Sequence, residues 1–522
     1  MHTTRRSDRF GAAALLGVVF TLAGCSVGPN FSKRDATVPV SKTWRQRDPR
    51  IATQAAAESK WWKGFNDPAL DRLIELAYAQ NLPLQIAGLR IVEARAQLAV
   101  AVGAQYPQQQ QFSGRALAVQ LSQGQPNVIG FDRNFFDYQL GFDANWELDL
   151  WGKFRRGVEA ESANLLASVA DYHSALVSLT AEVARTYAVV RTFEVLIEQA
   201  RENARLQEEG LRIADARFRN GATSELDVAQ ATTLLESTRA SIPELEVSLH
   251  QARNALSTLV GQRAGAVDTL LVGPKQIPTA PPTVAVSVPA EMLRRRPDIR
   301  SAELLAAAQC ARIGIAKAEL YPSFSLFGTV GLRASNSGGD ARNLFSSDSL
   351  YYAVGPQLNW PFLNYGRLKN NVRVQDARFQ QLLVNYRNTV LQAAQEVEDA
   401  LSGFVNAHES SMFNERSVQA ARRASELAMI EYQEGAVDYQ RVLDAQRFLL
   451  QQENNLARAR SSIAINLVAV YKALGGGWEL RQGQPIVPER IQQEMKERTD
   501  WGDLVNEPSS PETKQKLPRG RP

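Results

Sequence analysis

Two stretches decide the fold of this chain: GFDANWELDLWGK at residues 141–153 and GPQLNWPFLNYGR at residues 355–367. Each places an Asn-Trp pair ahead of a glycine that is followed by a basic residue, and Trp146 and Trp360 lie 214 positions apart. Each begins with the alternation of a strand and ends where a long helical pattern starts. Such a mixed pattern, written twice, predicts two copies of one large structural unit.

The repetition continues on both sides of these stretches. Tyr106 corresponds to Tyr321, and Gly221 corresponds to Gly435, at spacings of 215 and 214 positions. One short insertion near the strands explains the change of spacing. Each copy is therefore expected to read helix, strand pair, very long helix, turn and long returning helix.

Alternation of apolar and polar residues marks the strands. Between Phe136 and Leu148 every second residue is apolar, which predicts a strand with one apolar and one polar face. The strand pairs are expected at about 108–149 and about 322–363.

Long segments without Gly or Pro mark the helices. A helix is expected to begin at Asp67-Pro68, and residues 158–209 contain neither Gly nor Pro. The second copy has a similar segment at 367–434, in which Gly403 is the only glycine and proline is absent. The returning helices are expected at 222–260 and 436–474, with Pro243 as the only break. Helices of this length indicate packing like that of coiled coils.

Composition excludes several classes of protein. The net charge of +4 is too small to favour nucleic-acid binding, and no apolar run is long enough for a transmembrane helix. No catalytic motif, phosphate loop or paired-histidine spacing occurs, so we expect no enzyme activity, cofactor or metal site. His173, His250 and His408 are expected on helix surfaces.

The first residues read as an export signal, with a basic start and a short apolar run from Gly11 to Leu22. Leu22-Ala23-Gly24-Cys25 resembles a bacterial lipoprotein box, which implies cleavage before Cys25 and acylation of its thiol and amine. The alternative is an ordinary secretory signal with an incidental cysteine. Ser26 favours sorting to the outer membrane, and Cys310 is expected only to pack.

The alternating strands fit a soluble sandwich or a membrane barrel equally well. Aromatic residues near the strand ends, such as Tyr138, Trp146, Tyr352 and Trp360, favour a membrane. Four strands cannot close a barrel, and lipid does not tolerate an open edge. The chain would therefore have to oligomerise and share one barrel.

Several short stretches, taken in order, resemble the outer-membrane factors of tripartite efflux pumps, the TolC-like channel family, in its lipoprotein branch. They cover residues 25–478. The stretches that carry the resemblance are CSVGPNF (25–31), WWKGFNDPALDRLIELAYAQNLPL (61–84), PAEMLRRRPDIRSAE (289–303), YPSFSLFGTVG (321–331), LNWPFLNYGR (358–367) and VYKALGGGW (470–478).

The resemblance implies an α+β membrane protein. Three chains would form a homotrimer, each giving four strands to one twelve-stranded β-barrel that continues into a periplasmic α-helical barrel. It implies an efflux channel of the outer membrane, of the kind linked to drug resistance, anchored in lipid at Cys25. Its partners would be a periplasmic adaptor (membrane fusion protein) and an inner-membrane RND-type pump.

These expectations divide the chain into six parts. They are a signal peptide at 1–24, a lipid-anchored segment at 25–66, repeat 1 at 67–261, a linker at 262–288, repeat 2 at 289–478, and a polar tail at 479–522 that is expected to be a solvated, mobile terminus.

The turns between the long helices are the sharpest candidate sites. Each has a glycine where a left-handed residue ends a helix, followed by a polar residue that can cap the next helix. The resemblance implies that these turns are also the periplasmic tips at which the adaptor docks. The residues concerned are Gly221, Thr223, Ser224, Gly435, Val437 and Asp438.

The resemblance also implies a gate. Asp444 matches the family's acidic constriction, with Gln440 and Arg441 close by, and three copies of Asp444 around one axis would attract cations. Asp227 and Tyr432 match a pair that links neighbouring hairpins in the closed state. The alternative is that Arg441 and Asp444 form an ordinary surface pair three residues apart.

A second class of function also fits the pattern, a structural outer-membrane lipoprotein that acts as a helical strut without a pore. The four alternating strands argue against it, because a strut has no use for them.

Overall fold

The computed structural model describes residues 26–32, 43–53, 58–124, 132–286, 295–337, 340–481 and 483–505. Cys25, the predicted signal peptide and the last part of the tail lie outside the described residues. The chain forms two compact units. Unit 1 consists of Met1–Thr37, Glu93–Ala167 and Ala302–Tyr386, and unit 2 consists of Val38–Val92, Ser168–Ser301 and Arg387–Pro522.

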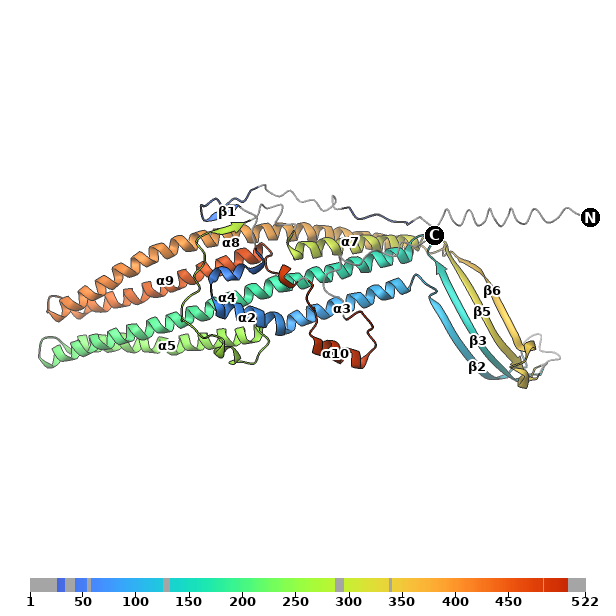
Figure 1. The fold of residues 1–522 in the computed structure, drawn as a ribbon, viewed down its shortest axis with the longest axis horizontal. Coiled ribbons are helices and arrows are strands. Elements are labelled where there is room, and N and C mark those ends of the chain that lie inside the picture. Colours follow the sequence, from blue (N-terminus) through green and yellow to red (C-terminus); the bar gives the residue numbers. More distant parts are fainter. Residues whose placement is uncertain are drawn as a thin grey trace, which may run out of the picture. The chain divides into compact units, whose positions relative to one another are not determined.

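Unit 1 contains a four-stranded antiparallel sheet in the order β2-β3-β5-β6 (Figure 1). The strands are β2 (Gln109–Gln120), β3 (Asn134–Leu148), β5 (Ser323–Ser335) and β6 (Leu350–Asn359). The helices that enter this unit are α3 (Leu82–Gly103), α7 (Pro297–Ala318) and the first parts of α4 (Lys153–Arg219) and α8 (Arg367–Gln433).

The two faces of this sheet differ in polarity because of the register. Phe142 lies opposite Phe112 on β2 and Val330 on β5, and all three side chains are exposed. On the other face, the Asp137 carboxylate accepts a hydrogen bond from Arg333 Nε at 3.0 Å. The alternation expected from the sequence is therefore present as one apolar and one polar face.

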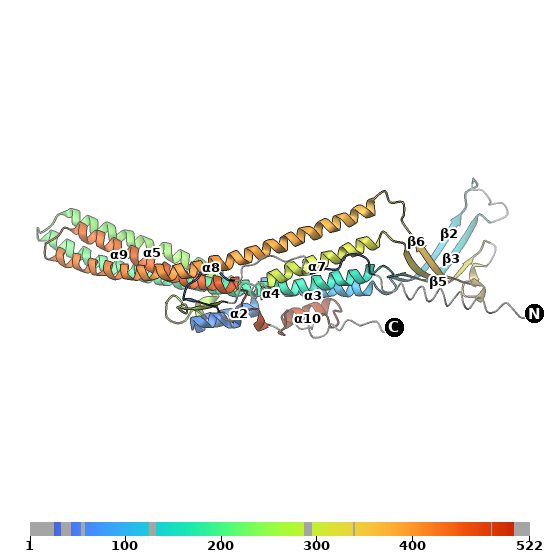
Figure 2. The ribbon, with the colours of Figure 1, turned by 90° about the horizontal axis from the view of Figure 1, so that it is seen from above.

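Two helical hairpins dominate unit 2, where their turns lie side by side (Figures 1 and 2). The helices α4 (Lys153–Arg219) and α8 (Arg367–Gln433) have 67 residues each and run from unit 1 into unit 2. The returning helices α5 (Glu225–Leu259) and α9 (Tyr439–Ala473) have 35 residues each.

The expectation that Pro243 breaks the returning helix is wrong, since α5 continues through it. A proline inside a helix removes one backbone hydrogen bond. Apolar side chains of α5 on both sides of Pro243, including Leu235 and Leu256, are buried, and this packing keeps the helix continuous.

The helix expected at Asp67-Pro68 is α2 (Pro68–Gln80). The Asp67 carboxylate caps it by accepting the Ala69 N–H at 3.0 Å. The Tyr187 hydroxyl donates to the other oxygen of this carboxylate at 2.6 Å, which joins the cap to α4. Short strands β1 (Ile51–Thr53) and β4 (Val284–Val286) pair in parallel, and the helix η2 (Glu58–Phe65) precedes α2 in the chain.

The tail after Trp478 is not a mobile terminus over its described part. It forms η6 (Glu479–Arg481) and α10 (Glu489–Arg498). Four apolar side chains in this otherwise polar segment are buried, and they hold it on unit 2: Ile486, Val487, Met495 and Val505. Gly88 permits this packing, because a Cβ atom there would lie 2.3 Å from the Ile486 carbonyl oxygen.

His173 is half-buried rather than fully exposed on its helix, and its ring stacks on Trp478 at 4.4 Å between centroids. Burial lowers the pKa of His173 to about 4. None of the helices within the described ranges is long and apolar enough to cross a membrane.

Candidate functional site

The two hairpin turns have the same backbone geometry. Gly221 (φ +70°) and Gly435 (φ +79°) both adopt the left-handed conformation that the sequence predicted. The Ala222 N–H donates to the Arg217 carbonyl at 2.8 Å, and the Ala436 N–H donates to the Glu431 carbonyl at 2.9 Å. These are the hydrogen bonds of a Schellman motif, which satisfies the last carbonyls of each outgoing helix.

The predicted N-cap positions are confirmed, but the capping hydrogen bonds are absent. Ser224 and Asp438 occupy the N-cap positions of α5 and α9, but neither side chain makes a capping hydrogen bond. Instead, the Thr223 hydroxyl donates to the Asp227 carboxylate one turn further on. Thr223 thereby helps to hold the carboxylate that the second hairpin also contacts.

A hydrogen bond between two predicted residues links the hairpins. The Tyr432 hydroxyl on α8 donates to Asp227 Oδ2 on α5 at 3.0 Å. The Tyr432 side chain is buried, and burial together with this hydrogen bond raises its pKa to about 12. The phenol therefore remains a neutral donor over the whole physiological range.

Arg217, which the sequence analysis missed, strengthens this link. Its Nη1 donates to the backbone carbonyls of Tyr432 at 2.5 Å and Gln433 at 2.9 Å, where α8 ends. Its guanidinium carbon lies 4.8 Å from the centroid of the Tyr432 ring. A cation is favourable at a helix C-terminus and over an aromatic face, so the two contacts reinforce each other.

Only one sequence signal pointed to Arg217, its place in the last turn of α4. A basic residue there usually stabilises its own helix. In the structure, the Arg217 guanidinium contacts the end of α8 in the other hairpin instead. No pattern in the sequence indicates this contact.

An apolar cluster packs around Tyr432, next to its hydrogen bond with Asp227. Its buried members are Ala214, Ala231, Leu234, Tyr432, Tyr439, Val442 and Leu443. The Tyr439 ring meets the Tyr432 ring edge-on at 5.1 Å, and burial raises the pKa of Tyr439. The half-buried Val437 packs on this cluster, so this predicted docking residue also has a packing role.

The predicted constriction residues form a second, separate contact. Gln440 Nε2 donates to Asp444 Oδ1 at 3.0 Å, and Gln230 Nε2 on α5 donates to Gln440 Oε1 at 3.2 Å. Asp444 and Arg441 are both exposed, and no ion pair joins them in the described part of the chain. The alternative of an Arg441–Asp444 surface pair is therefore wrong. Asp444 instead accepts a hydrogen bond from Gln440, one helical turn earlier.

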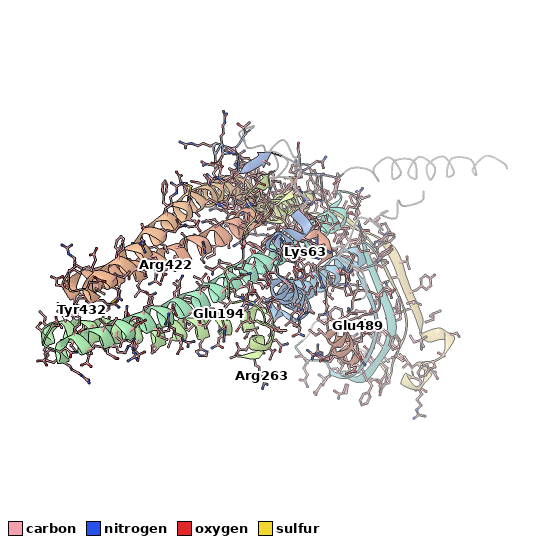
Figure 3. The ribbon with its side chains drawn as sticks, turned by 60° about the vertical axis from the view of Figure 1, so that its left-hand side comes forward. Lys63, Glu194, Arg263, Arg422, Tyr432 and Glu489 are labelled. Atoms are coloured by element: carbon pink, nitrogen blue, oxygen red, sulfur yellow. The ribbon has the colours of Figure 1, made fainter. Side chains whose placement is uncertain are left out.

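The arrangement is suited to a separable contact rather than to catalysis. Tyr432, Asp227 and Arg217 hold α4, α5 and α8 together through a few polar contacts near the ends of the hairpins, where Figure 3 places Tyr432. Each hydrogen bond of this kind contributes about 1 to 3 kcal/mol, so the contact between the hairpins is of modest strength. Within the described ranges, no group of three or more His, Cys, Asp or Glu residues is placed to hold a metal ion.

A sheet with an exposed apolar face, joined to paired helical hairpins of this length, defines the class of outer-membrane efflux channels. The chain belongs to the family described as outer membrane efflux protein, which it matches over residues 73–262 and 288–476. The prediction of a TolC-like outer-membrane factor is confirmed. The members of this family are channels of the outer membrane and not enzymes.

Individual relatives are similar over most of their length. The pyoverdine export outer membrane protein OpmQ of Pseudomonas putida is 31% identical, covering 82% of this chain and 90% of OpmQ. The cation efflux system protein CusC of Escherichia coli is 29% identical, covering 88% of this chain and 98% of CusC.

Solved structures agree with this assignment. The outer-membrane channel OprN has a TM-score of 0.80 at 33% identity, covering 87% of this chain and all of the OprN chain. The CusC structure has a TM-score of 0.73 at 27% identity, with the same coverage of both chains.

Proposed function

We propose that three copies of this chain assemble into one duct. It takes substrates from an inner-membrane RND-type pump and a periplasmic adaptor and releases them outside the cell. The two halves of the chain, which we regard as a duplication, supply alternate parts of its wall. The matching element lengths support this, since α4 and α8 have 67 residues each and α5 and α9 have 35 each.

The single observation that carries the proposal is the sheet of unit 1. Its apolar face is exposed on all four strands, and its outer strands β2 and β6 each pair on one side only among the described strands. Unpaired strand edges are not tolerated in lipid. Three such sheets joined edge to edge close a barrel of twelve strands, with the apolar faces toward lipid and the polar faces inward.

The strand lengths suit this role. They run from 10 residues in β6 to 15 residues in β3. About 9 to 11 residues of a tilted strand are enough to span the hydrocarbon region. Trp146 and Trp360, near the helical ends of β3 and β6, then lie at the level of an interfacial aromatic belt.

The hairpin ends act as the gate in this proposal. Asp227 and Tyr432, with Arg217, hold the closed arrangement within one chain. Three copies of Asp444, each held by Gln440, form the acidic constriction, with Arg441 reducing its preference for cations. The exposed tip residues Gly221, Ser224, Gly435 and Asp438 and the half-buried Thr223 and Val437 offer the surface on which the adaptor docks.

Acylation of Cys25 anchors the protein in the outer membrane, since several acyl chains hold a protein firmly where one does not. The cargo is selected by the pump and not by the duct. Relatives of similar identity support this, because they are named for pyoverdine, for cations and for toluene.

Single-channel conductance of the purified protein in planar bilayers tests the proposal, with the trimer checked on an unheated gel. Wild type is compared with Asp444→Ala and with Arg441→Ala on the same helix. We expect a small conductance that prefers cations, a loss of that preference in Asp444→Ala, and a stronger preference in Arg441→Ala. A conducting trimer indifferent to Asp444 would retain the channel and discard this constriction.

The same experiment tests the alternative of a strut without a pore. A strut predicts no conductance under any condition and no trimer on the unheated gel. A trimer that stays silent until Tyr432→Phe loosens the hairpins would instead support a gated duct.

A further inference from the structure

Two arginines lie at one level of the polar face of the sheet in unit 1. Arg115 on β2 and Arg333 on β5 are both directly opposite Gln139 on β3. The strand β3 runs from Asn134 to Leu148, and α4 begins shortly after its end. Gln139 and the two arginines therefore lie in the half of the sheet that is remote from the helices.

One carboxylate serves both guanidinium groups. Asp137 accepts hydrogen bonds from Arg333 Nε at 3.0 Å and from Arg333 Nη2 at 3.3 Å, and Arg115 Nη2 lies 3.9 Å from Asp137 Oδ2. The Asp137 side chain is only 6% exposed, whereas those of Arg115 and Arg333 are 53% and 59% exposed. A solute above this face therefore meets the guanidinium groups, and two positive charges against one negative charge leave one positive charge per chain.

Neutral partners hold Arg115 in place. Its Nη2 donates to Gln139 Oε1 at 2.7 Å, and Gln139 Nε2 donates to the Tyr351 hydroxyl on β6 at 2.6 Å. The Tyr351 ring lies over two opposed glycines: a Cβ atom on Gly141 would lie 2.9 Å from its hydroxyl oxygen, and one on Gly331 would lie 2.9 Å from its Cε1 atom. The charge of Arg115 is thus fixed on a rigid element by a network that spans three strands.

The nearest acidic residues other than Asp137 do not cancel this charge. Asp143 is four positions along β3 from Gln139, which is about 14 Å at about 3.4 Å per residue. Charges interact over about 8 Å at physiological ionic strength, so Asp143 is largely screened from the arginines. Asp348, just before β6, is exposed and forms no ion pair with either arginine in the described part of the chain.

We propose that Arg115 and Arg333, held by Asp137 and Gln139, form a cationic layer that binds soluble oxyanions weakly and favours the passage of anions. In the proposed trimer, three copies of the layer surround one lumen near its outer end, and rings of Arg select anions in pores. Arginine suits carboxylate and phosphate groups because its planar fork donates two parallel hydrogen bonds. The inference rests on the proposed duct.

The register decides which anions the layer meets. Gln139 lies on the opposite face of β3 from Tyr138 and Leu140, because successive side chains of a strand point to opposite faces. The apolar face is the one proposed to contact lipid. The layer therefore meets dissolved anions in the lumen and not the phosphate groups of lipids, which makes citrate a suitable probe.

A set of variants changes the charge of the layer in known steps. Arg115→Gln removes one positive charge, Arg115→Lys keeps it, and Asp137→Asn adds one by removing the carboxylate. The double variant Arg333→Gln with Asp137→Asn removes a close ion pair together, so no buried charge is left unpaired and the net charge is unchanged. Arg342→Gln is the matched control, because Arg342 is an exposed arginine on η4 (Ala341–Asn343), outside the strands.

Binding of citrate to the purified protein tests the layer without any conductance. In calorimetry at low ionic strength, we expect Arg115→Gln to bind citrate about tenfold more weakly than wild type, as loss of one charged hydrogen-bonding group predicts. Arg115→Lys and Arg342→Gln should stay close to wild type, and added salt should abolish the binding. No binding by wild type, or equal weakening in Arg115→Gln and Arg342→Gln, would overturn the proposal.

The ratio of chloride to potassium permeability in planar bilayers tests selection by the layer. We expect this ratio to fall about twofold in Arg115→Gln and to rise by a similar factor in Asp137→Asn, because the sign of charge lining a narrow space sets the local concentration of ions. The double variant and Arg342→Gln should keep the wild-type ratio. If the wild-type gate is closed, all variants are compared in the Tyr432→Phe background. An unchanged ratio in Arg115→Gln would contradict the proposed selection.

The two readouts separate this proposal from the proposed function. A conducting trimer that binds no citrate would retain the duct and remove the layer. Citrate binding that depends on Arg115, in a protein that never conducts, would support the anion site and remove the duct.

Discussion

Helices α4 and α8 have the same length of 67 residues, but their side chains are covered to very different extents. Val177 on α4 is 6% exposed, while Leu391 at the corresponding position of α8 is 59% exposed. Ala160 and Val374 show the same contrast, at 1% and 46%. Within one chain, α4 is a core helix and α8 is largely a surface helix with apolar residues on it.

This difference shows that the second half of the chain leaves apolar side chains of its long helix uncovered. Helix α4 is covered by other parts of the same chain, such as the α2 cap at Asp67 and the segment around Trp478. Exposed apolar patches on a folded chain mark surfaces that another molecule covers. In the proposed duct, that molecule is the next copy of the chain.

The largest effect is expected when a charged residue is placed at one of these corresponding positions on α4 or α8. Leu391→Asp should abolish the trimer on an unheated gel while leaving a folded monomer, because a carboxylate buried at an interface costs several kcal/mol. Val177→Asp should instead reduce the amount of folded protein, since its position is already buried within one chain. Gln392→Asp, at a neighbouring exposed polar position, serves as the control. A normal trimer in Leu391→Asp would show that this face of α8 is not a subunit contact.

The next largest effect concerns the link between the hairpins. Arg217→Met removes two hydrogen bonds from a guanidinium and its contact with the Tyr432 ring. We expect the closed state to lose about 2 kcal/mol, which raises the open probability in bilayers roughly tenfold or more.

Glu431→Met is the matched control for Arg217→Met, because Glu431 holds the corresponding position on α8 and is exposed. Its conductance should stay that of wild type. If both variants conduct alike, the contacts of Arg217 do not hold the closed state.

A smaller effect is expected from pH. Burial lowers the pKa of His173 from about 6.5 to about 4, so the unfolded chain binds a proton in this window that the folded chain does not. Stability should therefore fall as the pH falls from 6.5 toward 4. His173→Phe should flatten this part of the profile, measured as the thermal midpoint of the purified protein. His250→Phe, at an exposed position on α5, should leave the profile unchanged; equal flattening in both would assign the slope to other groups.

The smallest effect separates the two turns. Gly221→Ala and Gly435→Ala should each cost about 1 kcal/mol, because alanine is strained at positive φ. A Cβ atom on Gly221 meets open space, whereas one on Gly435 would lie 3.3 Å from Arg217 Nη2. Only Gly435→Ala should therefore raise conductance as well as lower stability. Identical conductance in the two variants would show that Arg217 adapts without loss of the link.

Much of the fold could be predicted from local pattern. The alternation from Phe136 to Leu148 is realised in β3, and the absence of Gly and Pro after residue 158 is realised in α4. Two errors came from the same kind of local reasoning. Pro243 was expected to break the returning helix, and the polar tail was expected to be mobile, but packing within unit 2 decided both.

The candidate site could be predicted only in part. Gly221 and Gly435 carry a backbone signal, and Asp227 and Tyr432 entered through the family resemblance. Arg217 carries no such signal, because its target lies 215 positions away on another helix. The packing of the N-terminal segment at residues 26–30 was missed for the same reason: Gly28 and Gly314 are distant in sequence and meet only in the folded chain.

The sequence by itself determined the element types, the left-handed turns and the family, because periodicity, glycine and short motifs act over a few residues. Only the tertiary structure decided which of two similar helices is buried, which arginine ties the hairpins together and where the N-terminal segment is held. These outcomes depend on contacts between residues far apart in the chain, and two nearly equal halves of a sequence cannot indicate which half will be covered by the rest.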